Sequence, residues 1–506
     1  MSFSRSTSDP STLNPAHMTV ATAIILVGAW LRLRGAFGEM WFDEIWSYNI
    51  AMGLESWHEA FWKQPKDNNH PLNTLWLYLM GPGREMWVYH LFSVITGTAS
   101  IFVAGWIAAR KGSRRSPSRL LVTMLLVAVL YPYINFGSEA RGYAPMMLFT
   151  VLAYGAVEPP DTKAYVARWG YGLAGLLAVL SHLAAVPVLV ALSLCFAIRQ
   201  RLQGHSFVHA LHATVRLNAP LVAGLLVFVS GILYGAHLNG NVIQFGGSTL
   251  TCLDKNCFVT ALDEMTRFTV GGFGEKASGL YSGLYLIMIL GSVLWLAAIG
   301  NRRALPLGLI LLGVPLLFFA ANQPALPHGR YFLAVFAFVP FLVAEVMGEL
   351  LKRGFAARMF CSVALIALVG ANAVAVKNFL AIGRGNTNPA FAYILENSTI
   401  QPITIGTEMK YQLKTVMDFV QHRQAPDHST IDIIKFKNIP DKKPEWLVSV
   451  TIHTQNLPAQ ACTGGLLYTL VHGYGHWGMA GSTWGLYRLS PSPAPKDCVW
   501  LTDGRE

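Results

Sequence analysis

The chain has 506 residues, of which 53% are hydrophobic and only 13% are charged. A soluble protein carries about twice that share of charged residues, so the composition excludes an ordinary soluble enzyme and predicts a membrane protein. The net charge of +11 would suit nucleic-acid binding, but the basic residues flank apolar segments, where membrane topology explains them. We therefore expect no nucleic-acid partner.

Eleven apolar segments predict a polytopic α-helical membrane domain over residues 1–380. Helices that cross a bilayer need about 17–25 apolar residues, and segments close to this length recur along the chain. They are residues 18–35, 86–108, 120–136, 143–158, 169–182, 183–198, 217–236, 279–299, 304–321, 330–350 and 359–379. No small-residue cleavage site follows the first segment, so we expect a retained anchor rather than a cleaved signal peptide.

The orientation depends on residues 169–198, which are too long for one untilted helix and short for two. We split them at Ser181 and His182, because the number of spans decides on which side the basic residues lie. With eleven spans, the basic clusters within 110–115, 163–168, 199–216, 302–303 and 352–358 share one face. Cytoplasmic loops carry an excess of Lys and Arg, so that face is predicted to be cytoplasmic.

This topology leaves the outer loops 36–85 and 237–278 and the C-terminal segment 381–506 outside the cytoplasm. We expect a multi-pass protein of the plasma (inner) membrane whose C-terminus is extracytoplasmic. Each outer part has an even number of cysteines, as expected where disulfides persist. We predict the bridges 252–257 and 462–498, with a C-x4-C metal site as the alternative for the first.

The segment after residue 380 is less hydrophobic and is predicted to form a small α/β domain. Helix-like stretches at 388–398 and 408–422 alternate with strand-like stretches at 402–407, 431–436, 445–452, 466–472 and 484–490. The run "GYGHWG" at 473–478 has the spacing of a dinucleotide-binding fingerprint. No helical pattern follows it, so we interpret it as a turn.

Two adjacent acids, Asp43 and Glu44, lie between tryptophans in the first outer loop, in "WFDEIWS". Asp43 could cap a helix over 44–57, but capping does not explain a pair of acids near Arg32, at the outer end of the first span. A carboxylate in a partly dry site has a raised pKa, which suits a general base. Arg32 is either functional or extends its side chain to the interface.

Three further outer motifs contain candidate binding residues. His70 precedes Pro71, a residue typical of a helix start, so His70 either caps that helix or faces an anion, a metal or an acceptor oxygen at its positive end. Arg141 and Arg330 reach the outer headgroup level, where guanidinium groups can hold a lipid phosphate. The alternatives are contact with the interface and salt bridges to Glu139 or Asp43. His182, in the predicted turn, is interpreted as structural.

These motifs resemble those of the GT-C superfamily, polytopic transferases that use polyprenyl-phosphate sugars. The resemblance rests on "WFDEIWS", "NNHPLNTLWLYL", "SEARGYAP", "LSH" and "PHGRYFLAVFAFVP", and it covers about residues 20–350. The sequence is similar to bacterial relatives of protein O-mannosyltransferases, lipid A aminoarabinose transferases and rhizobial lipopolysaccharide galacturonosyltransferases. The family usually has "HPP" where this chain has "HPL".

The resemblance implies an inverting glycosyltransferase whose active site faces the outside. Asp43 would deprotonate an acceptor hydroxyl, and Arg141 and Arg330 would stabilise the departing lipid phosphate. The other donor-binding candidates are Tyr143, Tyr331, His70 and Arg32. Some relatives bind a divalent metal, for which Glu44 and His70 would be the ligands, and no other cofactor is expected. The expected partners are membrane lipids, a polyprenyl-phosphate sugar, and a glycan, lipid or protein acceptor.

Two other functions are compatible with a membrane protein of this kind. A flippase or transporter of lipid-linked glycans needs polar residues along a path through the whole membrane, whereas here the polar motifs gather at the outer face. A lipid-linked oligosaccharide ligase or oligosaccharyltransferase would use the same outer motifs, so the sequence leaves that alternative open.

Overall fold

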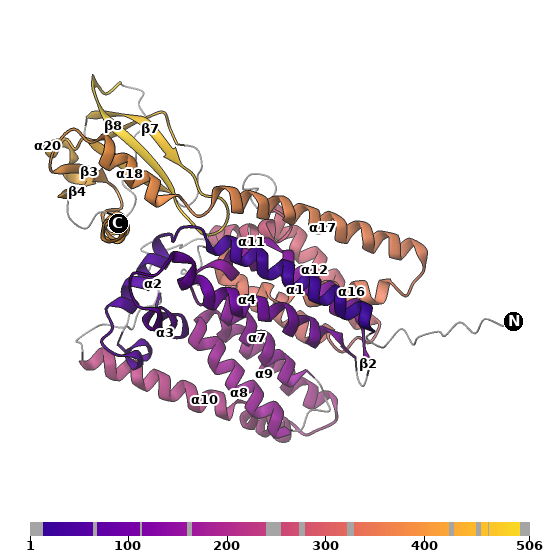
Figure 1. The fold of residues 1–506 in the computed structure, drawn as a ribbon. Coiled ribbons are helices and arrows are strands. Elements are labelled where there is room, and N and C mark those ends of the chain that lie inside the picture. The colour runs from indigo at the N-terminus through magenta and orange to yellow at the C-terminus, as the bar shows by residue number, and fades with distance from the viewer. Residues whose placement is uncertain are drawn as a thin grey trace.

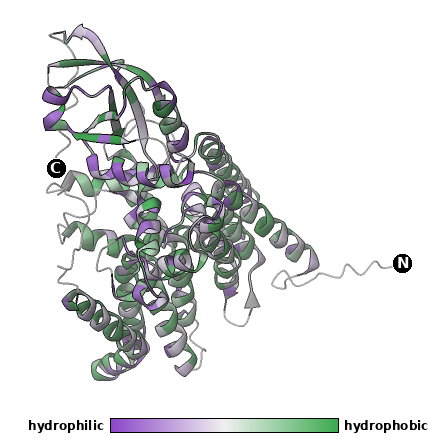
Figure 2. Ribbon diagram, turned by 60° about the vertical axis from the view of Figure 1, so that its left-hand side comes forward, coloured by the Kyte–Doolittle hydropathy of each residue, from purple (hydrophilic) through white to green (hydrophobic). Residues whose placement is uncertain are grey.

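The structure, a computed structural model, describes residues 14–63, 68–111, 114–158, 164–238, 255–272, 279–320, 328–424, 430–451, 457–463 and 465–495. Within these ranges the chain forms a bundle of long helices with a mixed α/β domain at one end of it (Figure 1). Figure 2 shows hydrophobic residues along the long helices and more hydrophilic residues in the α/β domain. This division agrees with the predicted membrane and C-terminal parts.

Helix occupies all eleven segments that the sequence predicts to be spans, as far as the structure describes them. In chain order these helices are α1 (Pro15–Ala36), α4 (Met86–Ala109), α5 (Pro117–Val129) with α6 (Tyr131–Asn135) and η2 (Phe136–Ser138), α7 (Tyr143–Val157), α8 (Ala164–Ser181), η3 (Leu183–Ala185) with α9 (Val186–Leu202), α10 (Phe207–Leu238), α12 (Leu280–Ala298), α13 (Ala304–Gly308) with η4 (Leu309–Gly313) and α14 (Val314–Ala320), η5 (Gly329–Phe332) with α15 (Leu333–Phe336) and α16 (Val339–Leu350), and α17 (Phe355–Ile382).

The expected number of eleven spans is not confirmed. Within the described ranges, six helices are long and apolar enough to cross a membrane, or eight if each of two bent pairs is one span. The bent pairs are 117–138, with a bend of 62°, and 329–350, with a bend of 44°. Tyr143–Val157 and Ala304–Ala320 are shorter apolar helices. The chain is thus a multi-pass membrane protein in which several predicted spans are broken or short.

The predicted split of residues 169–198 into two helices is correct. Helix α8 ends at Ser181, and His182 has extended backbone angles before η3 and α9 begin. The Tyr171 hydroxyl of α8 donates to the Leu189 carbonyl of α9 at 2.9 Å. This contact brings the two helices side by side and leaves His182 at the turn between them.

Three short helices fill the loop between α1 and α4: α2 (Phe42–Met52), η1 (Trp57–Phe61) and α3 (Pro71–Met80). The predicted helix over 44–57 is therefore shorter than expected and ends at Gly53. Helix α11 (Lys255–Thr269) lies between α10 and α12 in the chain and packs against η5. These elements lie at the same end of the bundle as the α/β domain (Figure 1).

The α/β domain has a six-stranded sheet with the order β4-β3-β5-β8-β7-β6. Strand β3 (Ile403–Thr407) is parallel to β4 (Ile431–Lys435) and β5 (Trp446–Thr451), whereas β5, β8 (Thr483–Pro493), β7 (Leu466–Tyr474) and β6 (Gln460–Thr463) pair antiparallel. Its helices are α18 (Thr387–Asn397), α19 (Lys410–Gln424) and α20 (Ile439–Lys442), with the turn η6 (Phe436–Asn438) before α20. All seven predicted elements are present, and the sequence reading missed β6 and α20. A two-residue hairpin, β1 (Arg110–Lys111) with β2 (Arg114–Arg115), follows α4.

The domain is joined to the membrane part by aromatic contacts between α19 and α2. The Tyr411 ring meets the rings of Phe42 and Trp46 edge-on, and the Phe419 ring meets that of Tyr48. The start of the domain is also attached, because Glu39 accepts from the Thr387 hydroxyl at 2.8 Å. The domain thus covers the helix that carries the acid pair.

Each predicted disulfide has one cysteine outside the described residues, at Cys252 and Cys498, so both bridges stay predictions. The two cysteines of the predicted spans, Cys195 and Cys361, are buried free thiols. The "GYGHWG" run forms the end of β7 and the turn that leads to β8, and no helix follows it. The interpretation of that run as a turn is therefore correct.

Candidate active site at the end of the bundle below the α/β domain

The acid pair occupies the first turn of α2, where the two carboxylates have different partners. The N-cap of α2 is Trp41, and its backbone N–H donates to Glu44 Oε2 at 3.3 Å. Glu44 therefore caps the helix, and the alternative reading of Asp43 as the cap is wrong. The Asp43 side chain is left to face other elements.

Asp43 is the meeting point of two arginines from distant parts of the chain. Its Oδ2 accepts from Arg141 Nη1, in the turn before α7, and forms an ion pair with Arg330 Nη1, in η5, at 2.8 Å. All three side chains are nearly buried. Burial raises the pKa of Asp43, but Arg330 and Arg141 outweigh this effect and hold it below its usual value. The expectation that the pKa of Asp43 is raised is therefore wrong. The alternative that Arg141 and Arg330 form salt bridges to Asp43 is correct.

His70 lies against Arg141 rather than capping α3. Arg141 Nη2 donates to Asn68 Oδ1 at 2.7 Å and contacts His70 Nε2 at 3.0 Å. A guanidinium only donates, so His70 Nε2 accepts and the ring is neutral. Burial and then the nearby His182, Arg141 and Arg330 lower the pKa of His70 well below its usual value. A neutral His70 thus orients Arg141.

His182 completes this wall of the site and also has the structural role that the sequence predicts, because its Nδ1 accepts from the Ala184 N–H at 3.0 Å at the start of η3. Its ring stacks on those of His70 and Tyr143, with centroids 4.6 Å away in both cases, and meets the Tyr331 ring edge-on at 6.4 Å. Burial, Arg141 and Arg330 lower the pKa of His182 to about 3. The signal that could have identified it is its isolated position in the predicted turn between two apolar segments, on the side where the sequence also places the "RGY" and "GRY" motifs.

Tyr143 and Tyr331 lie next to the arginines with which they were predicted to act. The Arg141 guanidinium lies over the Tyr143 ring at 5.2 Å, and that of Arg330 lies 5.9 Å from the Tyr331 ring and 5.3 Å from the Trp41 ring. Such cation–π contacts hold a guanidinium in place without neutralising its charge. The aromatic rings therefore fix both cations beside Asp43.

The Trp41 ring contacts the Arg330 guanidinium, and Glu139 in turn orients Trp41. The Trp41 Nε1–H donates to Glu139 Oε1 at 3.0 Å, which orients the indole ring under Arg330. Burial, followed by the neighbouring carboxylate of Glu44, raises the pKa of Glu139 to about 7. Its Oε2 is buried and has no hydrogen-bond partner among the described residues.

Glu44 is fully engaged in a second, separate cluster. Its Oε1 lies 2.8 Å from His90 Nε2 and accepts from the Ala140 N–H at 2.6 Å. His90 Nδ1 lies 2.7 Å from the Ala36 carbonyl oxygen, so the ring is held from both of its nitrogens. Glu44 thereby holds the turn that presents Arg141, which the sequence reading did not foresee.

The predicted metal site at Glu44 and His70 does not fit this geometry. The two side chains have different partners, His90 for Glu44 and Arg141 for His70. In the described part of the chain, no group of three or more His, Cys, Asp or Glu residues is arranged to hold a metal ion. Two guanidiniums occupy the position beside Asp43 where a cation would otherwise lie.

Arg32 is not part of the site, so its prediction as a donor-binding residue is wrong. It is fully buried, and its guanidinium donates to the carbonyls of Val127 and Ala128, with Nη2 2.7 Å from Val127 O. The residue four positions after Ala128 is Pro132, which has no N–H, and α5 ends at the bend. Arg32 therefore satisfies carbonyls that the break between α5 and α6 leaves open.

The ion pairs of the site leave an excess of positive charge. Two guanidiniums share the single carboxylate of Asp43, and the Nε atoms of Arg141 and Arg330 are buried without a partner among the described residues. A buried cation without full compensation is costly. The site is thus electrostatically suited to an anion that approaches both arginines.

The fold agrees with the resemblance that the motifs suggested. No protein-family model and no curated protein matches the sequence. ArnT from Cupriavidus metallidurans, in the apo state, is similar with a TM-score of 0.52 and 12% identity, over 86% of this chain and 92% of that chain. The chain therefore has the same overall fold as that structure.

An oligosaccharyltransferase from Archaeoglobus fulgidus, in the apo form, is also similar. Its TM-score is 0.48 at 13% identity, and the match covers 80% of this chain and 64% of that chain. ArnT bound to undecaprenyl phosphate gives a TM-score of 0.45 at 13% identity, over 94% and 98% of the two chains. Neither similarity is strong enough to add to the fold assignment.

Proposed function

We propose that this protein is an integral-membrane inverting glycosyltransferase. It moves a sugar from a polyprenyl-phosphate donor to an acceptor hydroxyl on the extracytoplasmic side. The observation that carries the proposal is the convergence of Arg141 and Arg330 on Asp43, because it joins a carboxylate and two phosphate-binding groups in one buried cluster.

The excess positive charge supports binding of the donor phosphate. Guanidiniums form paired, charge-assisted hydrogen bonds to phosphate oxygens. The cation–π contacts with Tyr143, Tyr331 and Trp41 keep both guanidiniums in position before the donor binds. The leaving phosphate gains negative charge as the glycosidic bond breaks. Preorganised cations at that position stabilise the transition state more than the ground state.

Asp43 is the proposed base, and donor binding prepares it for that role. Without donor, the two arginines lower its pKa and make it a weak proton acceptor. When the phosphate shares these guanidiniums, their charge is partly neutralised and the pKa of Asp43 rises toward a useful range. The carboxylate is therefore activated only when the donor is in place.

The chemical step is a single displacement. The acceptor oxygen forms a bond to the anomeric carbon, while the bond from that carbon to the phosphate oxygen breaks on the opposite face. The acceptor proton passes to Asp43, and the polyprenyl phosphate leaves with the bonding electron pair. Attack opposite the leaving group inverts the configuration of the sugar.

Transfer with defined donors tests the proposal. The full-length protein in lipid nanodiscs is supplied with polyprenyl-phosphate sugars, one at a time, and with lipid-linked oligosaccharides, and release of the lipid phosphate is measured. The proposal expects release with a single-sugar donor and its loss in Asp43→Asn. Release from oligosaccharide donors alone would contradict it and favour a ligase. Unchanged release in Asp43→Asn would remove the assigned base.

A further inference from the structure

The turn between β7 and β8, residues 475–482, reaches from the α/β domain onto the helix bundle (Figure 1). The Trp477 N–H donates to the Gly383 carbonyl, and the Ser482 N–H donates to the Arg384 carbonyl, both at 3.0 Å. The turn is therefore attached to the segment that links α17 to the domain.

The turn fits onto Tyr131, a fully buried residue at the break between α5 and α6. The Met479 N–H donates to the Tyr131 hydroxyl at 3.0 Å, and the Trp477 ring meets the Tyr131 ring edge-on at 5.0 Å. Gly478 has a φ of 113°, and a Cβ at this position would lie 1.7 Å from the Tyr131 hydroxyl. Only glycine permits this approach.

Beyond Tyr131, the Met479 side chain reaches the backbone that carries Arg330. Its Cε lies 2.9 Å from the position that a Cβ of residue 329 would take. On its other side, the same position lies 2.9 Å from the Ala261 carbonyl oxygen of α11, and the Gly329 N–H donates to Glu264 at 2.9 Å. Gly329 is thus enclosed between α11 and Met479.

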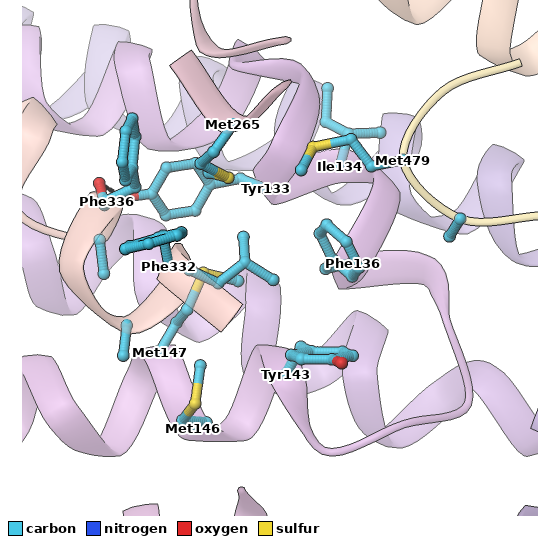
Figure 3. Packing of buried hydrophobic residues seen from close by; sticks show 14 of the residues in the cluster. Tyr133, Ile134, Phe136, Tyr143, Met146, Met147, Met265, Phe332, Phe336 and Met479 are labelled. Carbon is cyan, nitrogen blue, oxygen red and sulfur yellow. Dashed lines mark hydrogen bonds between the residues drawn. The ribbon is translucent and has the colours of Figure 1, made fainter. Parts of the chain in front are cut away.

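Figure 3 shows Met479 and Ile134 in a cluster that also contains Phe332, which follows Arg330 and Tyr331 in η5. The cluster is buried and apolar, so Met479 is packed rather than loosely apposed. Because close-packed interiors transmit small displacements, a shift of Met479 is expected to shift Gly329.

The segment that carries Arg141 is held by the same connection. Arg384 Nη2 donates to the Asn135 carbonyl at 2.7 Å and to Ser138 Oγ at 3.0 Å, just before the turn with Arg141. The Arg384 carbonyl in turn accepts from Ser482 of the β7–β8 turn. The domain therefore contacts the supports of both arginines.

We propose that the β7–β8 turn is a positioning element of the active site and that Met479 is the residue through which it sets Arg330. The α/β domain then helps to position the phosphate-binding residues, in addition to covering α2. The proposal rests on the proposed function for the role of Arg330, but the mechanical coupling of Met479 to Gly329 does not depend on it.

Hydrogen exchange of residues 328–333 in the full-length protein tests the coupling. Gly478→Ala and Met479→Ala are expected to increase exchange there, and Met479→Leu is expected to restore protection. Gly465→Ala is the matched control, because Gly465 also has a positive φ, of 76°, but a Cβ there would meet no atom within 4 Å. Unchanged exchange in Met479→Ala and Gly478→Ala would overturn the proposal.

Binding of undecaprenyl phosphate to the same variants tests the link to function. Met479→Ala is expected to weaken binding on the order of 10–100-fold, the cost of a small misplacement, with Gly465→Ala unchanged and Met479→Leu close to wild type. If hydrogen exchange of residues 328–333 increases in Met479→Ala but the wild-type protein does not bind undecaprenyl phosphate, the proposed function is wrong and the coupling of Met479 to Gly329 is supported. If wild type binds and Met479→Ala alters neither exchange nor affinity, the positioning role fails.

Discussion

Arg330 Nη1 lies 2.8 Å from Asp43 Oδ2, and the same oxygen accepts from Arg141. The two arginines flank a carboxylate that would otherwise be a raised-pKa acid in a buried site. This relationship makes the charge of each group depend on the other two. It also decides what each substitution at the site should do.

Asp43→Asn should separate donor binding from transfer. Loss of the carboxylate removes the proton acceptor, and general-base residues contribute on the order of 10²–10⁴-fold to rate. The two guanidiniums lose their shared carboxylate, so affinity for undecaprenyl phosphate should hold or increase. Transfer rates and lipid-phosphate binding measure the two effects. Asp418→Asn, at an exposed position on α19, is the control, and weaker phosphate binding in Asp43→Asn would contradict the assignment.

Arg330→Lys should lower transfer although it keeps the positive charge. Lysine cannot form the paired contacts of a guanidinium or the same contact with the Trp41 ring, and removal of one stabilising donor typically costs about 10²–10³-fold in kcat. The loss should appear in both kcat and phosphate affinity. Arg302→Lys, at an exposed position, should change neither. An Arg330→Lys variant with wild-type kcat would refute the phosphate role.

Stability should fall as the pH decreases below about 6.5, and His182 should contribute to the fall. The pKa of His182 is lowered to about 3 in the folded protein, whereas an unfolded histidine has a pKa of about 6.5. Between these values the unfolded chain binds more protons than the folded chain, so the free energy of unfolding falls as the pH is lowered. His182→Phe keeps a stacked ring and should flatten this part of a melting-temperature profile.

The exposed His212 on α10 gives the control for that profile. His212→Phe should follow the wild-type curve between pH 6.5 and pH 4. A His182→Phe profile as steep as that of wild type would mean that the imidazole ring is not held neutral in the folded state.

Chelation of divalent metals should leave transfer unchanged, whereas Glu44→Gln should reduce it. Glu44 holds His90 and the Ala140 N–H rather than a metal, so its loss should loosen the turn that presents Arg141. Activity after treatment with EDTA, compared with that of Glu44→Gln in the same buffer, distinguishes the two roles. Loss of activity on chelation, with recovery on adding metal, would contradict the structural role of Glu44.

Membrane orientation can be checked with single cysteines in a background without the native thiols. A cysteine at the exposed Glu85, in the loop after α3, should react with an impermeant reagent from the outside. A cysteine at the exposed Arg201, at the end of α9, should react only after permeabilisation. The opposite pattern would invert the proposed topology.

Much of this architecture could be predicted from the sequence because hydrophobic length and charge dominate it. The eleven apolar segments correspond to helices, and the alternating pattern of the C-terminal part correctly predicted its main strands. The breaks were missed, since a proline such as Pro132 marks a possible bend without giving its angle. Strand β6 is short and follows no clear alternation, which explains its omission.

The site was predictable as a set of motifs but not as a set of partners. Asp43, Arg141 and Arg330 could be identified from the sequence, because charged residues close to membrane-spanning segments are rare and are usually paired or functional. The lowered pKa of Asp43 depends on which cations reach it, and that is a property of tertiary structure. His90 and Arg384 carried no local signal, because a single polar residue in an apolar chain is compatible with many environments.

The position of Arg32 has a consequence for how the chain is built into the bilayer. Its Nη1 donates to Gly28 O of the same helix at 2.9 Å, and its other acceptor carbonyls belong to Val127 and Ala128, which leave the ribosome long after α1 has done so. The first helix therefore enters the lipid with only one of these acceptors in place, and Nη2 gains its acceptor from Val127 when α5 is present. Biogenesis of this protein thus includes an interval in which α1 depends on the insertion machinery, or on the lipid headgroups, to shelter that charge.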